Sequence, residues 1–239
     1  MTTELKIDFV SDIACPWCAV GLGALEQALA ATGDTVKATL QFQPFELNPQ
    51  MPPGGQDITE HIAQKYGSTP EQQQKSRAMI RARGAEVGFD FRMEARSRIY
   101  NTFDAHRLLH WADETGRPDG ADGMPGQQRL LKKALLAAYF TEGLSPESHD
   151  VLLGAVAQAG LDTARARGIL AGDAYAADVR ARERFYLDQD IHAVPAIIID
   201  ERHLISGGQP AEVFERVLRK IAARRAQEAA EAGTDGAGR

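Results

Sequence analysis

Two closely spaced cysteines are the residues of this 239-residue chain best suited to chemistry. Cys15 and Cys18 enclose Pro16 and Trp17 in a Cys-Pro-Trp-Cys sequence, and the chain contains no further cysteine. At the start of a helix, the first sulfur of such a pair lies beside unpaired backbone N–H groups and the positive end of the helix dipole, which favour the thiolate. This pattern predicts that Cys15 is a nucleophile and that Cys18 resolves a mixed disulfide by intramolecular attack. Pro16 and Trp17 adjust the geometry and exposure of the pair.

A zinc site and an inert pair are the competing interpretations of these cysteines. Structural zinc normally has four protein ligands, and here His106 and His110, one helical turn apart, would have to complete the set. Because the chain has no second cysteine pair, we expect no metal site. An inert pair is also disfavoured, since a strand before the cysteines and a helix after them supply the context of a redox site.

Hydrophobic patterning predicts the elements that position the pair. Alternation of apolar and polar residues predicts a strand over residues 5–10 and another over residues 36–42. Between them, Pro16 suits the first turn of a helix, so the cysteines open that helix. The apolar residues that this helix turns towards the core are Val20, Leu22, Leu25 and Leu29.

The rest of the chain is predicted to be mostly helical. Helix-like spacing of apolar residues extends from about residue 58 to residue 187, and turn signals rich in Gly and Pro divide it into five to seven helices. Strand character returns at residues 194–200, and residues 203–205 complete a predicted hairpin. A terminal amphipathic helix follows, and beyond Arg225 we expect a disordered tail.

Composition and charge exclude several classes of protein. The chain has 27 Lys and Arg against 33 Asp and Glu, a formal charge of −6, with 44% hydrophobic and 25% charged residues. This is ordinary globular composition, without the basic excess of a nucleic-acid binder. The densest apolar stretch, residues 194–199, is far shorter than a membrane span, so we expect no membrane partner. The first residues lack the basic start and apolar run of a secretory signal, which predicts a cytoplasmic protein.

Several segments together resemble the DsbA family of thioredoxin-fold proteins. These are the Cys15-Pro-Trp-Cys18 sequence, Ala193-Val194-Pro195-Ala196 before the late hairpin, and the helical block between them. The sequence is similar, more narrowly, to the FrnE-like cytoplasmic branch, whose recurrent segments resemble residues 44–49, 101–108 and 205–210. The likeness extends from about residue 5 to residue 221.

The resemblance implies an α/β thioredoxin fold (βαβ...ββα) with a large all-helical insertion. Residues 1–50 and 190–224 would form a discontinuous thioredoxin-like domain, residues 56–189 the insertion, and residues 225–239 the tail. The family also implies that Pro195 is a cis proline that lies against the active-site cysteines. Val194, the residue before it, would then offer its backbone to an incoming peptide or thiol.

His106 and Asn101 each have two interpretations. A protonated imidazole near the sulfurs would lower a cysteine pKa, so His106 is a candidate proton carrier or charge partner. Histidines of this kind more often pack as structural residues. Asn101 is a candidate for orienting a substrate, or for capping the helix that follows it.

Aromatic and basic residues complete the candidate site. Trp17 and Phe45 are candidates for an apolar rim that receives unfolded peptide or a small aromatic substrate, or for ordinary packing between the domain and its insertion. A basic cluster, Arg77, Arg81 and Arg83, has the spacing of a solvated helix face. Binding of glutathione or of an acidic partner is the alternative interpretation, and we assign the cluster no role.

The function that this sequence favours is thiol–disulfide exchange without a metal or nucleotide cofactor. Its expected partners are thiols and disulfides of proteins or small molecules, with glutathione as a candidate co-substrate, and it would be a monomer or a homodimer. The enzymatic alternative is a glutathione-dependent isomerase or transferase resembling 2-hydroxychromene-2-carboxylate isomerase, which uses bound glutathione, commonly beside a serine. The third alternative is a zinc-bound or redox-inert protein that binds client chains.

Overall fold

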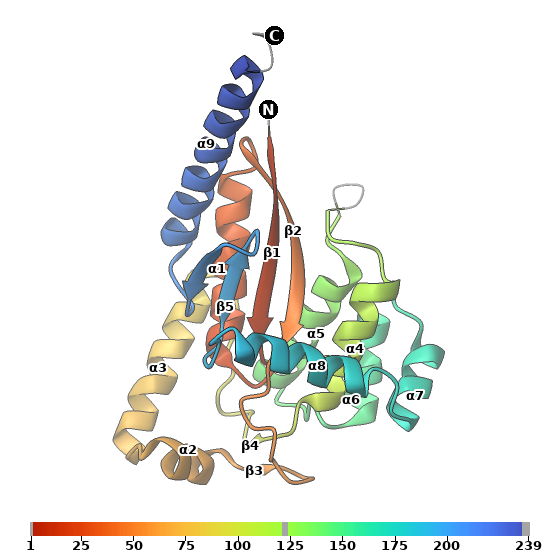
Figure 1. Cartoon of the computed structure of the whole chain (residues 1–239). Helices are drawn as coiled ribbons and strands as arrows, with labels where there is room; N and C mark the ends of the chain where they lie inside the picture. The colour runs from red at the N-terminus through yellow and green to blue at the C-terminus, as the bar shows by residue number, and fades with distance from the viewer. Residues whose placement is uncertain (1, 121–123, 236–239) are drawn as a thin grey trace.

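The computed structural model describes residues 2–120 and 124–235. A mixed four-stranded sheet lies at its centre, with the long helices α1 (Pro16–Ala31) and α9 (Ala211–Asp235) packed against each other on one side. Most of the remaining helices gather beyond one edge of the sheet (Figure 1). The chain therefore divides into a sheet with two flanking helices and a helical part, as the sequence predicts.

The sheet has the strand order β2-β1-β5-β6. β1 (Thr3–Ser11) pairs in parallel with β2 (Val36–Pro44) and antiparallel with β5 (Ala196–Ile199), which forms a hairpin with β6 (His203–Ser206). The parallel pair requires a crossover connection, and α1 supplies it. The predicted βαβ unit and late hairpin are confirmed. The start of β5 comes close to the cysteine loop, because Ala196 pairs with Val10 near the end of β1.

The helical part lies between β2 and β5 in the sequence. Its helices among the described residues are α2 (Ile58–Tyr66), α3 (Pro70–Glu86), α4 (Phe103–Thr115), α5 (Gln127–Phe140), α6 (His149–Gln158), α7 (Thr163–Ala171) and α8 (Ala176–Asp188). The insertion is helical as expected, with one addition. Two short strands, β3 (Gln56–Asp57) and β4 (Arg98–Ile99), pair antiparallel within it. Two residues are too few to show the alternation that predicts a strand.

Two apolar clusters meet at α5. Leu136 and Tyr139 pack with Cys15 and Cys18 in the cluster beneath the sheet, whereas Leu131 belongs to the cluster of the helical part. Ile13, in the loop before the cysteines, joins this second cluster. The cysteine loop therefore lies at the boundary between the sheet and the insertion.

Gln128 of α5 connects the edge strand β2 to the helical insertion through hydrogen bonds. Its Oε1 accepts from the backbone N–H of Phe42 at 2.9 Å, and its Nε2 donates to the carbonyls of Phe42 at 2.9 Å and Leu109 at 3.2 Å. Because β2 is an edge strand, the outward groups of Phe42 have no strand partner, and the buried amide takes that place.

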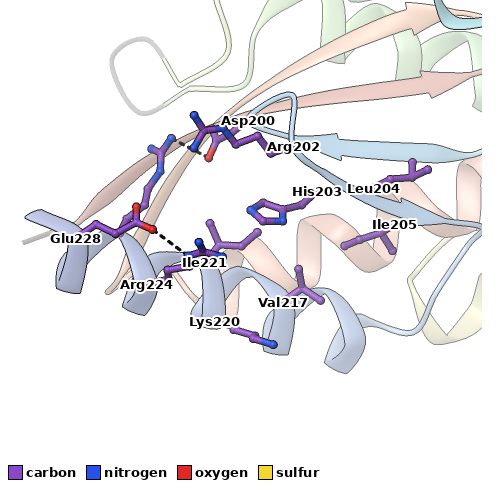
Figure 2. A pocket seen from close by; sticks show the side chains of 11 residues that line it. Asp200, Arg202, His203, Leu204, Ile205, Val217, Lys220, Ile221, Arg224 and Glu228 are labelled. Carbon is purple, nitrogen blue, oxygen red and sulfur yellow. Dashed lines mark hydrogen bonds and ion pairs between the residues drawn. The ribbon is translucent and has the colours of Figure 1, made fainter. Parts of the chain in front are cut away.

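The C-terminal helix is longer than the sequence predicts. The structure continues α9 beyond Arg225 as far as Asp235, and residues 236–239 lie outside the described residues. Alanine, glutamate and glutamine favour helix, and Arg224 pairs with Glu228 one turn later at 2.9 Å, as the dashed line in Figure 2 shows. A solvated helix and a disordered tail share such a composition. The sequence therefore predicts the start of the tail too early, within the helix that the structure continues to Asp235. Across the described ranges, no helix is both long and apolar enough to span a membrane.

We expect Gln128→Leu to lower the free energy of unfolding by about 3 kcal/mol, because it leaves the buried N–H and carbonyl of Phe42 without partners. Urea denaturation followed by circular dichroism measures the change. Gln74→Leu, on the exposed face of α3, is the control and should change stability by less than about 0.5 kcal/mol. Equal stability of the two variants would contradict the role of Gln128.

Candidate active site

The cysteine pair occupies the position that its sequence predicts. Cys15 is the N-cap residue of α1 with extended backbone, Pro16 opens the helix, and the N–H of Cys18 donates to the carbonyl of Cys15 at 3.1 Å. Both side chains are free thiols, with Cys15 exposed by 4% and Cys18 by 0%. Both thiols are therefore buried, and Cys18 is the more fully enclosed of the two.

A cis proline lies against the nucleophile. The Val194-Pro195 peptide is cis, as the family resemblance implied, and the Cys15 Sγ donates to the carbonyl of Val194 at 3.6 Å. α1 approaches this loop closely, because a Cβ added at Gly21 would lie 3.2 Å from Pro195 Cγ. The structure thus brings Cys15, Val194 and Pro195 together from opposite ends of the chain.

A buried carboxylate, Asp12, organises the loop that carries the cysteines. It accepts from the backbone N–H of Ala14 at 3.1 Å and of Leu47 at 2.7 Å, and from the Thr102 hydroxyl at 2.8 Å. Burial by itself raises the pKa of Asp12, but the adjacent His106 and these donors outweigh it and hold the pKa below its usual value. Asp12 is therefore an anion that holds three segments at the base of the site.

His106 and Asn101 support the site from behind. The His106 Nε2 lies 3.5 Å from the Asp12 carboxylate, with the ring buried, so its described charge partner is Asp12 and not a sulfur. The Asn101 Oδ1 accepts from the N–H of Phe103 at 2.9 Å, and its Nδ2 donates to Glu46 at 3.3 Å. This geometry favours the capping interpretation of Asn101.

A buried lysine from the insertion lies near the cysteines. Lys132 of α5 is exposed by 1%, and its Nζ has no hydrogen-bond partner among the described residues. Burial lowers its pKa to about 8, although the charges of Cys18, Asp12 and Cys15 act in the opposite direction. A lysine with this pKa exchanges protons near neutral pH, which few lysines do.

The environment of Cys18 opposes its ionisation. Burial raises its pKa well above the usual value, the neighbouring Cys15 raises it further, and the charge of Lys132 lowers it. A resolving cysteine must become a thiolate to attack. Lys132 is therefore the described side chain whose charge does most to make that ionisation possible.

A cavity of about 610 Å³ opens beside Cys15. Trp17 and Phe45 both line it, together with Val194, and both also pack against buried apolar residues. Residues of α2 and α3 form the opposite wall, and they include Lys65 and Arg77. A substrate in this cavity would meet the Cys15 sulfur.

A second groove lies between β6 and α9, far along the chain from the cysteines. Four of its charged residues form ion pairs, Arg225 with Asp200 at 3.0 Å and Arg224 with Glu228 at 2.9 Å, and Figure 2 draws the second as a dashed line. Neither cysteine lines it. Because no cysteine lines this groove, we assign it no part in thiol chemistry.

The histidines of α4 do not complete a cysteine zinc site. His110 lies 3.4 Å from Glu114 and packs on Tyr175, and His106 faces Asp12. Within residues 2–120 and 124–235, no cluster of three or more His, Cys, Asp or Glu side chains is arranged to hold a metal ion.

Asp12 and Lys132 are absent from the predicted site, and only Lys132 carries a signal in the sequence. The apolar positions of α5 recur at residues 131, 135, 136 and 139, and this spacing places Lys132 on the buried face of the helix. A lysine at a position where the helical spacing predicts an apolar residue indicates a buried charge with a partner. Asp12 shows no comparable pattern, because its partners come from distant segments.

We expect Lys132→Met to stabilise the reduced protein at pH 7 by up to about 3 kcal/mol, because a pKa lowered from 10.5 to about 8 reflects an unfavourable buried charge. Between pH 8 and pH 10.5 the unfolded chain binds more protons than the folded chain, so the stability of the natural chain rises with pH. The difference in stability between the natural chain and Lys132→Met therefore shrinks over this range.

Urea denaturation at pH 7 and pH 10 measures this difference. The matched control is Lys133→Met, the same substitution at the next residue, which is exposed and pairs with Glu26 at 2.8 Å. The control should be neutral or slightly destabilising. Loss of stability in Lys132→Met that is independent of pH would contradict the assignment.

Comparison with known proteins agrees with this geometry. A probable DsbA oxidoreductase from Streptomyces coelicolor is 34% identical, with a TM-score of 0.78, over 90% of this chain and 89% of that one. An uncharacterized protein of Bacillus subtilis, YwbO, is 27% identical over 91% of this chain and 96% of its own. A 2-hydroxychromene-2-carboxylate isomerase shares the fold at 12% identity, with a TM-score of 0.65 over 93% and 98% of the two chains. The model of the DSBA-like thioredoxin domain matches residues 6–219, and the chain therefore belongs to the family of DsbA-like thiol–disulfide oxidoreductases.

Proposed function

We propose that this protein exchanges disulfides through Cys15 and Cys18. The observation that carries the proposal is the position of the Cys15 sulfur, which lies at the start of α1, against the Val194 carbonyl, and on the wall of a cavity. This arrangement leaves one sulfur accessible to a substrate and keeps the second enclosed behind it. It supports a nucleophile and a resolving thiol with separate roles.

The proposed reaction has two steps. The Cys15 thiolate attacks one sulfur of a substrate disulfide, a mixed disulfide forms, and the other substrate sulfur leaves as a thiolate that takes a proton. The Cys18 thiolate then attacks the Cys15 sulfur, which releases the second substrate thiol and forms the Cys15–Cys18 disulfide. The substrate is reduced by two electrons and the protein is oxidised by two. The reverse sequence oxidises a dithiol, and the potential of the couple against its surroundings sets the direction.

Lys132 has a defined part in the second step. A neutral amine near Cys18 accepts the thiol proton, and the ammonium ion that results stabilises the thiolate. The pKa of about 8 supports this role, since both forms of Lys132 are then populated near neutral pH. Asp12 is already held by four partners and stays an acceptor throughout.

Glutathione-dependent isomerisation is the competing activity, because an isomerase shares this fold. Cys18 distinguishes the two proposals. An isomerase that uses the thiol of bound glutathione has no need for a resolving cysteine, whereas disulfide exchange depends on it. Both cysteines of the chain belong to the pair, so no structural disulfide remains, which supports a reducing compartment such as the cytoplasm. Thiols and disulfides of small molecules or proteins are the proposed partners.

We expect Cys15→Ser to abolish reduction of a model disulfide, and Cys18→Ser to accumulate a mixed disulfide with the substrate. The first variant lacks the nucleophile and the second lacks the group that resolves the intermediate. Intact-mass spectrometry after acid quenching detects the adduct. Full disulfide-exchange activity in Cys15→Ser would refute the mechanism, and isomerase turnover in Cys18→Ser would favour the competing activity.

We expect Lys132→Met to slow resolution of the mixed disulfide about tenfold or more at pH 7, because each unit by which the Cys18 pKa rises lowers the thiolate population tenfold. The rate profile should also shift to higher pH. Rapid-quench measurement of mixed-disulfide decay between pH 6 and pH 10 tests this, with Lys133→Met as the control. An unchanged profile in Lys132→Met would remove the lysine from the mechanism.

A further inference from the structure

The cavity beside Cys15 is positively charged, although the chain as a whole carries a formal charge of −6. Its lining includes three strong cations, Lys65, Arg77 and Arg96, and one carboxylate, Glu46. Glu46 forms an ion pair with Arg180 and accepts a hydrogen bond from an amide, so its charge is already compensated. The cavity therefore favours an anionic occupant.

Arg96 is the unusual member of this set. It is exposed by only 6%, and its Nε and Nη1 atoms have no acceptor among the residues that the structure describes. The rings of Tyr139 and Phe140 lie 5.1 and 4.8 Å from its guanidinium carbon. Aromatic faces hold a guanidinium in place, but they leave its in-plane N–H groups unpaired. Because burial of unpaired donors is unfavourable, this side chain is arranged for an acceptor that comes from elsewhere.

Helix α3 contributes two further polar groups to the same cavity. Arg77 donates to the Thr59 hydroxyl at 3.3 Å, which holds it at the wall. The Gln73 Nε2 donates to the carbonyls of Thr59 at 3.1 Å and Ser68 at 3.4 Å, and this leaves its buried Oε1 without a donor. Residues with unpaired donors and with an unpaired acceptor therefore line one cavity, and a ligand that carries both a carboxylate and an N–H group would match them.

We infer that Arg96 is the carboxylate-recognition residue of the site and that the preferred substrates are small disulfides or thiols bearing a carboxylate, an inference that rests on the proposed exchange function. A guanidinium fork binds a carboxylate through two parallel hydrogen bonds. A cavity of about 610 Å³ is of the size that encloses small molecules rather than folded chains. Glutathione disulfide and short acidic peptides share this chemistry.

The test compares two disulfides that differ in charge. The anionic probe is 3,3′-dithiodipropionate and the neutral probe is bis(2-hydroxyethyl) disulfide. For the natural chain we expect a KM for the anionic probe about tenfold or more below that for the neutral probe. Arg96→Gln should remove this preference, with the KM for the neutral probe unchanged.

Arg81→Gln is the matched control. Arg81 lies on α3 one turn beyond Arg77, but it is exposed, does not line the cavity, and pairs with Glu94. It should leave both KM values unchanged. A loss of preference in Arg81→Gln equal to that in Arg96→Gln would reflect the overall charge of the chain, and it would overturn the assignment to Arg96.

A measurement on the natural chain tests the inference even if Arg96→Gln fails to fold. Iodoacetate and iodoacetamide alkylate the same sulfur but differ in charge, and mass spectrometry reports the rate at Cys15. We expect S-methylglutathione, which bears carboxylates and no free thiol, to protect Cys15 from alkylation. We also expect the ratio of the iodoacetate rate to the iodoacetamide rate to be at least threefold higher for the folded chain than for the urea-unfolded chain. Absence of protection together with equal ratios would overturn the carboxylate site.

The outcomes separate this inference from the proposed function. If the natural chain turns over neither probe nor glutathione disulfide, the proposed exchange function fails. If it turns over both probes with equal KM values, exchange stands and the carboxylate preference is refuted. Glutathione disulfide and an acidic peptide containing an intramolecular disulfide, compared in the same assay, distinguish the two sources of the carboxylate.

Discussion

The buried carboxylate of Asp12 is the interaction on which the rest of the site depends. It accepts hydrogen bonds from the cysteine loop, from the connection after β2 and from the residue before α4 of the insertion, and His106 lies beside it. A buried anion is stable only when such partners are present, so Asp12 requires all three segments to meet at one point. That point adjoins Cys15, whose backbone N–H donates to the Asp12 carbonyl at 3.3 Å. The sheet, the insertion and the nucleophile are therefore positioned by one ion.

Two buried cations from the insertion complete the charge arrangement around the sulfurs. Lys132 lies on the side of the enclosed Cys18, and Arg96 lines the cavity that Cys15 faces. Neither cation has a full set of hydrogen-bond partners among the described residues. Unpaired buried charge reduces stability, and sites that retain it are commonly functional. In this account the insertion supplies the proton acceptor and substrate recognition, and the thioredoxin-like part supplies the reacting sulfurs.

Much of the fold was predictable because its signals are local. The alternation of residues 5–10, the Cys-Pro-Trp-Cys sequence before a helix and the late hairpin each lie within one segment, and the DsbA resemblance ordered them correctly. The narrower FrnE-like placement stays a prediction. The sequence favours a solvated helix face for Arg77, whereas the structure places Arg77 on the cavity wall. Contacts of Asp12, Gln128 and Arg96 join distant segments, and no pattern along the chain encodes such contacts.

The central claim is that Cys15 and Cys18 form a working dithiol couple. A redox titration in glutathione buffers, with the two thiols trapped by alkylation and counted by mass, tests it most directly. The account predicts one reversible two-electron transition between two free thiols and one intramolecular disulfide. Failure of the chain to form that disulfide at any ratio of glutathione disulfide to glutathione would contradict it.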